Sequence, residues 1–229
     1  TDYNLFVNAG IDLGPNFELY TFGSYGIRDG IGAGFYRRSD DPRNRDYAAS
    51  TTVFVPYYPD GFLPKIQSQI EDVSGAVGVK GNLGSWNTDL SVVYGSNQLD
   101  YQTINSFNTS LGGIASPRRF DAGGIAFGQT TANLDVSRKF DVSWLSSLGI
   151  AFGAEYRNEN FKIRAGEVDS YINGPYSANG AGGGAQVFPG FRPNNAIDVS
   201  RDSVAGYGEI DADISKAFTL QAAGRYEHF

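Results

Sequence analysis

Cysteine is absent from the 229 residues, and this absence excludes disulfides, thiolate chemistry and cysteine-based zinc sites. Histidine occurs once, at His228, so a Ser-His-Asp triad would depend on that single side chain. Charged residues make up only 19% of the chain, and the formal net charge is −7. An acidic chain argues against nucleic acid as a partner, because binding to phosphates calls for a basic surface.

Long apolar runs are also missing. No stretch approaches the roughly 18 consecutive apolar residues that indicate a membrane-spanning helix. A transmembrane β-barrel escapes this test, because only every second residue of its strands faces lipid. No basic and apolar leader is visible at Thr1, so we expect either that a signal peptide was removed or that the sequence does not begin at the natural start.

Glycine, with 30 residues, and aromatic residues, at 14%, are abundant, and apolar residues recur on alternate positions. In the last segment, 218–229, the alternating set is Phe218, Leu220, Ala222, Gly224 and Tyr226. A period of two predicts strands with one apolar and one polar face. A slip of one residue would exchange the two faces, so the register is strongly specified.

The alternation predicts eight strands. Their expected bounds are 3–11, 17–37, 71–82, 86–107, 126–140, 147–164, 201–215 and 218–229. In the second of these strands Tyr20 and Phe22 compete with Leu19 and Thr21 for the apolar face, so its facing stays open.

The connections between these strands alternate in length. Short turns are expected at 12–16, 82–85, 141–146 and 215–217, and long loops at about 38–70, 108–125 and 165–200. Short turns at one end and long loops at the other are typical of outer-membrane barrels. The predicted fold class is therefore all-β, an antiparallel transmembrane β-barrel.

Aromatic residues mark both ends of the apolar face. Near the short turns lie Phe17, Trp86, Phe140, Trp144 and Phe218. Eight residues further along three strands come Tyr94, Tyr156 and Tyr226. Eight residues of a tilted strand span roughly 20 Å along the membrane normal, close to the height of the lipid-facing band in such barrels.

The opposite face predicts a hydrated lumen. Its expected lining is Asp89, Glu155, Arg157, Glu209, Asp211, Asp213, Arg225 and Glu227. Asp211 and Asp213 share a face and could hold a cation, but together with Glu209 they are better explained as lumen wall. We predict no metal site, no cofactor and no catalytic residues, and hence a protein that is not an enzyme.

Several segments resemble, in order, the barrel of TonB-dependent outer-membrane receptors. They are ELYTFGSYGIRDGIGAGFYR (18–37), YYPDGFLPKI (57–66) with VSGAVGVKGNLGSWNTDLSVVYGSN after it, FPGFRP (188–193) and RDSVAGYGEIDADISKAFTLQAAGRYEHF. The resemblance implies a barrel of about 22 strands, a bacterial outer-membrane location, and a separate plug domain that engages the TonB complex. Neither the plug nor the TonB-contact segment is present in this sequence.

Strand direction gives an expectation about completeness. The first strand runs toward a short turn and the last strand runs away from one, which places both ends on the long-loop side. We therefore expect about eight strands from the interior of a larger barrel, with a natural eight-stranded barrel as the alternative.

The long loops are the expected place for ligand contact, because functional residues concentrate on loops held by a rigid scaffold. The candidates are Tyr57, Tyr58, Phe62, Arg118, Arg119, Tyr171, Tyr176, Phe191 and Arg192. The alternative role for these residues is packing of one loop against another.

The predicted function is energy-coupled uptake of a scarce solute, such as an iron-siderophore, cobalamin or an oligosaccharide, by a protein that contacts membrane lipid. A passive porin or small structural outer-membrane barrel is the first alternative, and a soluble carbohydrate-binding β-sandwich is the second.

Overall fold

The computed structural model describes residues 2–215 and 217–229, so the predicted turn residue Lys216 lies outside the described set. Eight strands form one antiparallel sheet in which every strand pairs with its neighbours in sequence. The strands are β1 (Asp2–Asp12), β2 (Phe17–Ala33), β3 (Lys65–Leu83), β4 (Trp86–Ile104), β5 (Arg119–Phe140), β6 (Ser147–Arg164), β7 (Ile197–Ser215) and β8 (Phe218–His228). The prediction of an all-β chain with eight antiparallel strands is confirmed.

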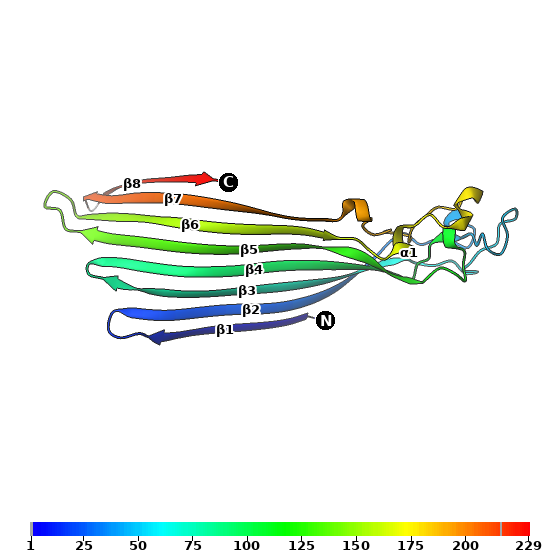
Figure 1. Ribbon diagram of the computed structural model, residues 1–229, viewed down its shortest axis with the longest axis horizontal. Helices are drawn as coiled ribbons and strands as arrows, with labels where there is room; N and C mark the ends of the chain where they lie inside the picture. The colour runs from blue at the N-terminus through cyan, green and yellow to red at the C-terminus, as the bar shows by residue number, and fades with distance from the viewer. Residues whose placement is uncertain (1, 216) are drawn as a thin grey trace.

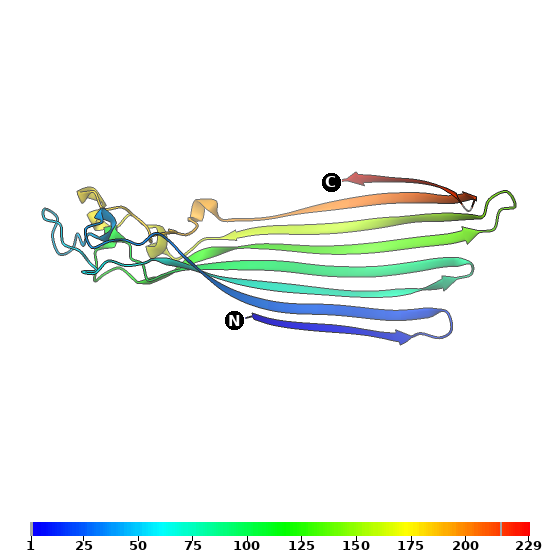
Figure 2. The same cartoon turned by 180° about the vertical axis from the view of Figure 1, so that it is seen from behind.

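The sheet is a continuous series of hairpins (Figure 1). Short turns lie at one end of the strands and the long connections gather at the other, as the view from behind also shows (Figure 2). β1 and β8 occupy opposite edges, and within the described residues each pairs with one strand only, β2 and β7 respectively. The outer edges of β1 and β8 therefore carry main-chain groups without a neighbouring strand.

Three strands begin four or more residues earlier than the sequence predicted, and one of them is β7, which starts at Ile197 rather than at 201. β3 starts at Lys65 rather than at 71, and β5 starts at Arg119 rather than at 126. These first residues are polar or glycine-rich and lack the apolar alternation, yet Lys65 pairs with both Ala33 and Ile104. Conversely, β2 ends at Ala33 instead of continuing to 37, and β4 ends at Ile104 instead of continuing to 107.

The long connections are correspondingly shorter, at 34–64, 105–118 and 165–196. They contain one short α-helix, α1 (Val168–Tyr171), and four 3₁₀ turns, η1 (Pro42–Asn44), η2 (Thr109–Leu111), η3 (Pro175–Asn179) and η4 (Pro193–Asn195). None of the helices in the described residues has the length and hydrophobicity needed to span a membrane.

The pairing register places the predicted apolar residues on one side of the sheet. Leu90, Leu134 and Ala154 pair in succession across β4, β5 and β6, and Ile150, Ile210 and Ala222 do so across β6, β7 and β8. We call this side the apolar face. It is uncovered in the described structure, since Leu134 is 45% exposed and Leu220 is 55% exposed. One layer of strands is therefore present, and not the two stacked layers of a sandwich.

The open question about the second strand is answered by pairing. Leu19 pairs with Val79, which pairs with Leu90, so Leu19 and the residues in step with it lie on the apolar face. Tyr20 and Phe22 lie on the opposite side. Tyr25 is in step with Leu19 and therefore also lies on the apolar face.

The most completely buried side chains lie among the loops and the adjoining strand ends. Phe107 and Phe120 have no exposed surface, and Phe62 retains only 4%. The packed core of the described chain is therefore at the loop end, whereas the middle of the sheet is a single layer of strands with no second layer packed on it in the described structure.

Candidate functional site

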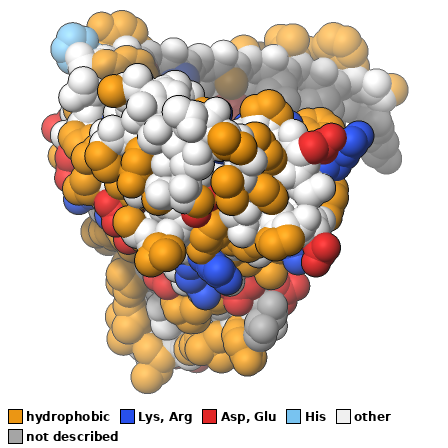
Figure 3. Space-filling view, turned by 90° about the vertical axis from the view of Figure 1, so that its right-hand side faces the viewer, with side chains coloured by type: hydrophobic (Ala, Val, Ile, Leu, Met, Phe, Trp, Pro, Cys, Tyr) orange, Lys and Arg blue, Asp and Glu red, His pale blue; other side chains and the backbone are white. Residues whose placement is uncertain are grey.

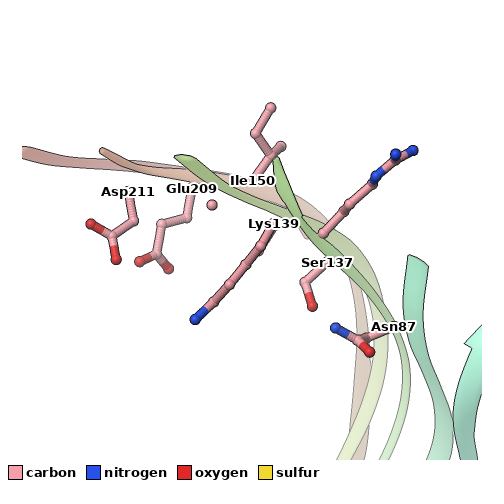
Figure 4. Close-up of a pocket in the computed structure, with 9 residues that line it drawn as sticks. Asn87, Ser137, Lys139, Ile150, Glu209 and Asp211 are labelled. Carbon is pink, nitrogen blue, oxygen red and sulfur yellow. The ribbon is translucent and has the colours of Figure 1, made fainter. Parts of the chain in front are cut away.

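All eight residues predicted to line a lumen share the side of the sheet opposite to the apolar face, which we call the polar face. The ladder pairs Glu155 with Asn133, Arg225 with Tyr207, and Asp89 with Asp135. Figure 4 shows that Asp211, Glu209, Lys139, Ser137 and Asn87 lie on the concave side of the curved sheet, whereas Ile150 points to the convex side. The polar face is therefore the inside of the curve.

Two carboxylates oppose each other directly on the polar face, near the short-turn end of β4 and β5. Asp89 on β4 pairs with Asp135 on β5, an arrangement of like charges that is unfavourable unless it is compensated. Each carboxylate accepts a tyrosine hydroxyl, from Tyr20 at 2.9 Å for Asp89 and from Tyr207 at 2.5 Å for Asp135.

The two tyrosines reach these carboxylates across glycines. A Cβ atom on Gly78 would lie 2.4 Å from the ring of Tyr20, and one on Gly153 would lie 2.5 Å from the ring of Tyr207. Each ring therefore lies flat over the backbone of an intervening strand. The same arrangement therefore occurs twice on the polar face, on either side of the carboxylate pair: a tyrosine ring packs over a glycine, and its hydroxyl donates to an aspartate.

Further toward the loops, four charged side chains form a network on the polar face. Arg157 contacts Glu155 at 2.7 Å and Glu227 at 3.1 Å, and Arg225 contacts Glu155 at 2.9 Å and Glu227 at 3.3 Å. Charges alternate around the ring, so each guanidinium is held by two carboxylates. The network joins side chains of β6 and β8 across the intervening strand β7 and leaves this part of the polar face charged.

Four aromatic rings from two loops form the centre of the loop end. Tyr58 lies 4.7 Å from Tyr57 and 4.7 Å from Phe62, and Phe107 lies 4.9 Å from Tyr57, each distance measured between ring centroids. The guanidinium of Arg118 lies over both tyrosines, 5.4 Å from each ring, and donates to the Tyr57 hydroxyl. We call these five residues the aromatic cluster.

A second aromatic group covers the upper part of the polar face. Phe188 and Phe191 lie 5.6 Å apart and both contact Tyr101 of β4, at 5.5 Å and 6.2 Å. The Thr103 hydroxyl donates to the Phe188 carbonyl at 2.7 Å. The third loop is therefore anchored over the inside of the curve.

Asn108 ties the loops together from a fully buried position. Its side-chain amide donates to the carbonyls of Asp169 and Ile172, and its amide oxygen accepts from Ser110. The sequence placed Asn108 in a loop but gave no sign of this role. Phe107 was predicted to end the strand 86–107, but the structure places it in the loop after Ile104, and the sequence gave no sign of its role there.

The structure distributes the predicted loop residues unequally. Tyr57, Tyr58, Phe62 and Arg118 meet in the aromatic cluster, whereas Phe191 belongs to the second group. Arg119 is directed onto strand residues, donating to Gln102 and Gln67. The remaining candidates, which lie outside both aromatic groups, are Tyr171, Tyr176 and Arg192.

Figure 3 looks onto the loop end, where hydrophobic side chains appear between charged ones.

Within the loops, burial raises the pKa of Tyr58, whose hydroxyl is enclosed without a hydrogen-bond partner. Two hydrogen bonds from the Arg43 guanidinium lower the pKa of Asp41 to about 2. No cluster of His, Asp and Glu side chains with the makings of a metal site occurs in the described part of the chain.

The apolar face carries a row of four tyrosines on alternate strands, Tyr25, Tyr94, Tyr156 and Tyr226. Only the last three were predicted, because the facing of Tyr25 was open. Following the ladder from Tyr25 leads to Ser96, two residues beyond Tyr94. The same offset recurs along the row. Following the ladder from Tyr94 leads to Asn158, two residues beyond Tyr156, and following it from Tyr156 leads to His228, two residues beyond Tyr226.

This regular step defines an angle. The row moves two residues along the strand direction for every two strands that it crosses. With the usual rise per residue and spacing between strands, the row is inclined by about 35° to the direction perpendicular to the strands. Two of the tyrosines also donate to carboxylates nearer the loops, Tyr156 to Asp202 at 2.6 Å and Tyr25 to Glu71 at 3.3 Å. The row is therefore a sharp boundary between the apolar band and a charged region.

Comparison with known proteins gives no match. No protein-family model, no curated protein and no solved structure aligns significantly with this chain.

Proposed function

We propose that the chain forms part of the wall of an outer-membrane β-barrel, and that this barrel belongs to a TonB-dependent receptor for a scarce solute. The observation that carries the proposal is the inclined tyrosine row. If the row lies in the plane of a membrane interface, the strands tilt by about 35° from the membrane normal, within the range of transmembrane barrels. In a sheet with water on both sides, no interface would require the four tyrosines to keep to one line.

The chemistry of the two faces supports the same proposal. An uncovered apolar face of this extent calls for lipid or another apolar partner. The concave polar face, with its carboxylates and guanidinium groups, has the character of a water-filled interior. The unpaired edges of β1 and β8 are suited to accept further strands, as a wider barrel requires.

The loop end supports a receptor in particular. The aromatic cluster presents Arg118 beside two tyrosines, and the second aromatic group lies across the inside of the curve. In this proposal the loops capture the solute above the polar face, and the TonB complex drives its release through a plug domain. Iron-siderophores, cobalamin and oligosaccharides are the candidate solutes.

Membrane placement is testable with spin labels, because the chain has no native cysteine. Leu134→Cys and Asn133→Cys are adjacent on β5 and face opposite sides. In lipid bilayers we expect the label at position 134 to be accessible to oxygen and shielded from a water-soluble nickel chelate, with the reverse at position 133. Equal exposure of both labels to the chelate would contradict membrane placement.

Transport is tested separately in host cells. Uptake of labelled siderophores, cobalamin and oligosaccharides is compared with and without functional TonB, and with and without the gene. We expect one solute whose uptake requires both. Uptake that needs the gene but not TonB would support a passive porin instead.

A further inference from the structure

Arg138 lies on the apolar face of β5. It pairs with Ile150 of β6 and is in step with Val136 and Phe140. The apolar band extends from the aromatic residues near the short turns up to the tyrosine row. In the described strands, Arg138 is the one charged residue that faces outward within this band.

The guanidinium of Arg138 rests on aromatic rings. It lies 4.6 Å from the centroid of Phe140 and 5.6 Å from that of Trp86. Trp86 in turn contacts Phe140 and Phe152 edge to face, at 5.9 Å and 5.7 Å. Two aromatic residues therefore contact the cation at the end of the band nearest the short turns, and Phe152 packs against one of them, Trp86.

This cation has no compensating charge. Among the described residues no carboxylate forms an ion pair with Arg138, and its Nε atom is buried without a hydrogen-bond partner. Its neighbour Lys139 projects to the polar face, so it belongs to a different environment. Leaving a guanidinium unpaired on an apolar surface is costly, which points to an anionic partner that the chain itself does not provide.

We propose that Arg138 binds the phosphate of a phospholipid headgroup in the leaflet at the short-turn end. The planar guanidinium matches the geometry of phosphate oxygens. The aromatic residues beneath it are those that favour the interface between acyl chains and headgroups. The inference rests on the proposed membrane function, because it takes the apolar face to contact lipid.

Lipid retention measured by native mass spectrometry tests this site. The intact protein in detergent is mixed with phosphatidylglycerol, or with a galactolipid that has the same acyl chains and no phosphate. We expect Arg138→Gln to lower retention of phosphatidylglycerol about fivefold or more, and Arg138→Lys to lower it less, because lysine keeps the charge but loses the two-pronged contact. Lys139→Gln is the matched control and should retain the lipid as the unaltered protein does.

Three results would overturn the inference: equal retention by the Arg138→Gln variant, equal retention of the galactolipid, or displacement of the lipid by millimolar inorganic phosphate. The last result would indicate a site for free phosphate. These failures are distinguishable from failure of the membrane proposal, since the spin labels at positions 133 and 134 report membrane placement independently of Arg138.

Discussion

The hydroxyl of Tyr207 donates to Asp135 across the bare backbone of Gly153, and so links β7 to β5 over the intervening strand β6. Tyr20 and Asp89 make the same connection across Gly78. The glycines are required by contact, since a side chain at either position would occupy the space of the ring. The two bridges also give each of the opposed carboxylates, Asp89 and Asp135, a hydroxyl donor.

The first prediction concerns Gly153. We expect Gly153→Ala to lower the free energy of unfolding by about 1–3 kcal/mol, because the added methyl group displaces the Tyr207 ring and breaks its hydrogen bond. Gly149→Ala is the control on the same strand and face, where the new Cβ would meet Asp211 at 3.7 Å, an ordinary contact. Urea unfolding in detergent measures both. If the two variants unfold alike, the ring does not require that glycine.

The second prediction compares two adjacent tyrosines in the aromatic cluster. The buried hydroxyl of Tyr58 has no partner, so Tyr58→Phe should leave stability unchanged or raise it by about 1 kcal/mol. Tyr57→Phe removes an acceptor used by Arg118 and should increase hydrogen exchange in the loop around residue 118. Loss of stability in the Tyr58→Phe variant would indicate that its hydroxyl has a partner in solution.

The third prediction concerns acid. The pKa of Asp41 is lowered from its ordinary 3.8 to about 2, mainly by hydrogen bonds from Arg43. A lowered pKa means that the ionised carboxylate stabilises the folded loop above 3.8, and that this contribution is lost as the pH falls toward 2. Hydrogen exchange of residues 38–46 should therefore accelerate within that interval. In the Asp41→Asn variant this acid-dependent step should be absent, and its persistence would assign the step to another group.

The fourth prediction concerns Asn108. Asn108→Ala removes, inside a fully buried site, the side-chain donor to the carbonyl of Asp169 and one donor to the carbonyl of Ile172, which keeps the backbone N–H of Gly184. We expect a loss of about 2–3 kcal/mol in the stability of the loop end, with faster hydrogen exchange in residues 165–185. Asn179→Ala, at an exposed position, should change neither quantity. Unaltered exchange in the Asn108→Ala variant would show that the loops hold together without this residue.

The sequence was most informative where one face of a strand is apolar. The alternation from Leu148 to Tyr156 predicted both the strand and its facing. It was least informative for residues 65–70 and 119–125, where pairing with neighbouring strands fixes the conformation without any apolar signal.

The packing of the loop end could not be predicted from the sequence for a related reason. Phe107 and Asn108 acquire their roles from contacts with residues more than 45 positions away, such as Tyr57 and Asp169. No local pattern encodes such contacts. Four of the nine predicted loop residues do meet in the aromatic cluster, three of them through ring contacts and Arg118 through its position over Tyr57 and Tyr58.

The tyrosine row also constrains what can lie beside β8. From β2 to β8 the row shifts toward the short turns by one residue for each strand crossed. If two further strands were added at that edge, the second would continue the row only with an aromatic residue on the apolar face two positions nearer the short turns than Tyr226. An added hairpin without this offset would break the line between the apolar band and the charged region next to Tyr226.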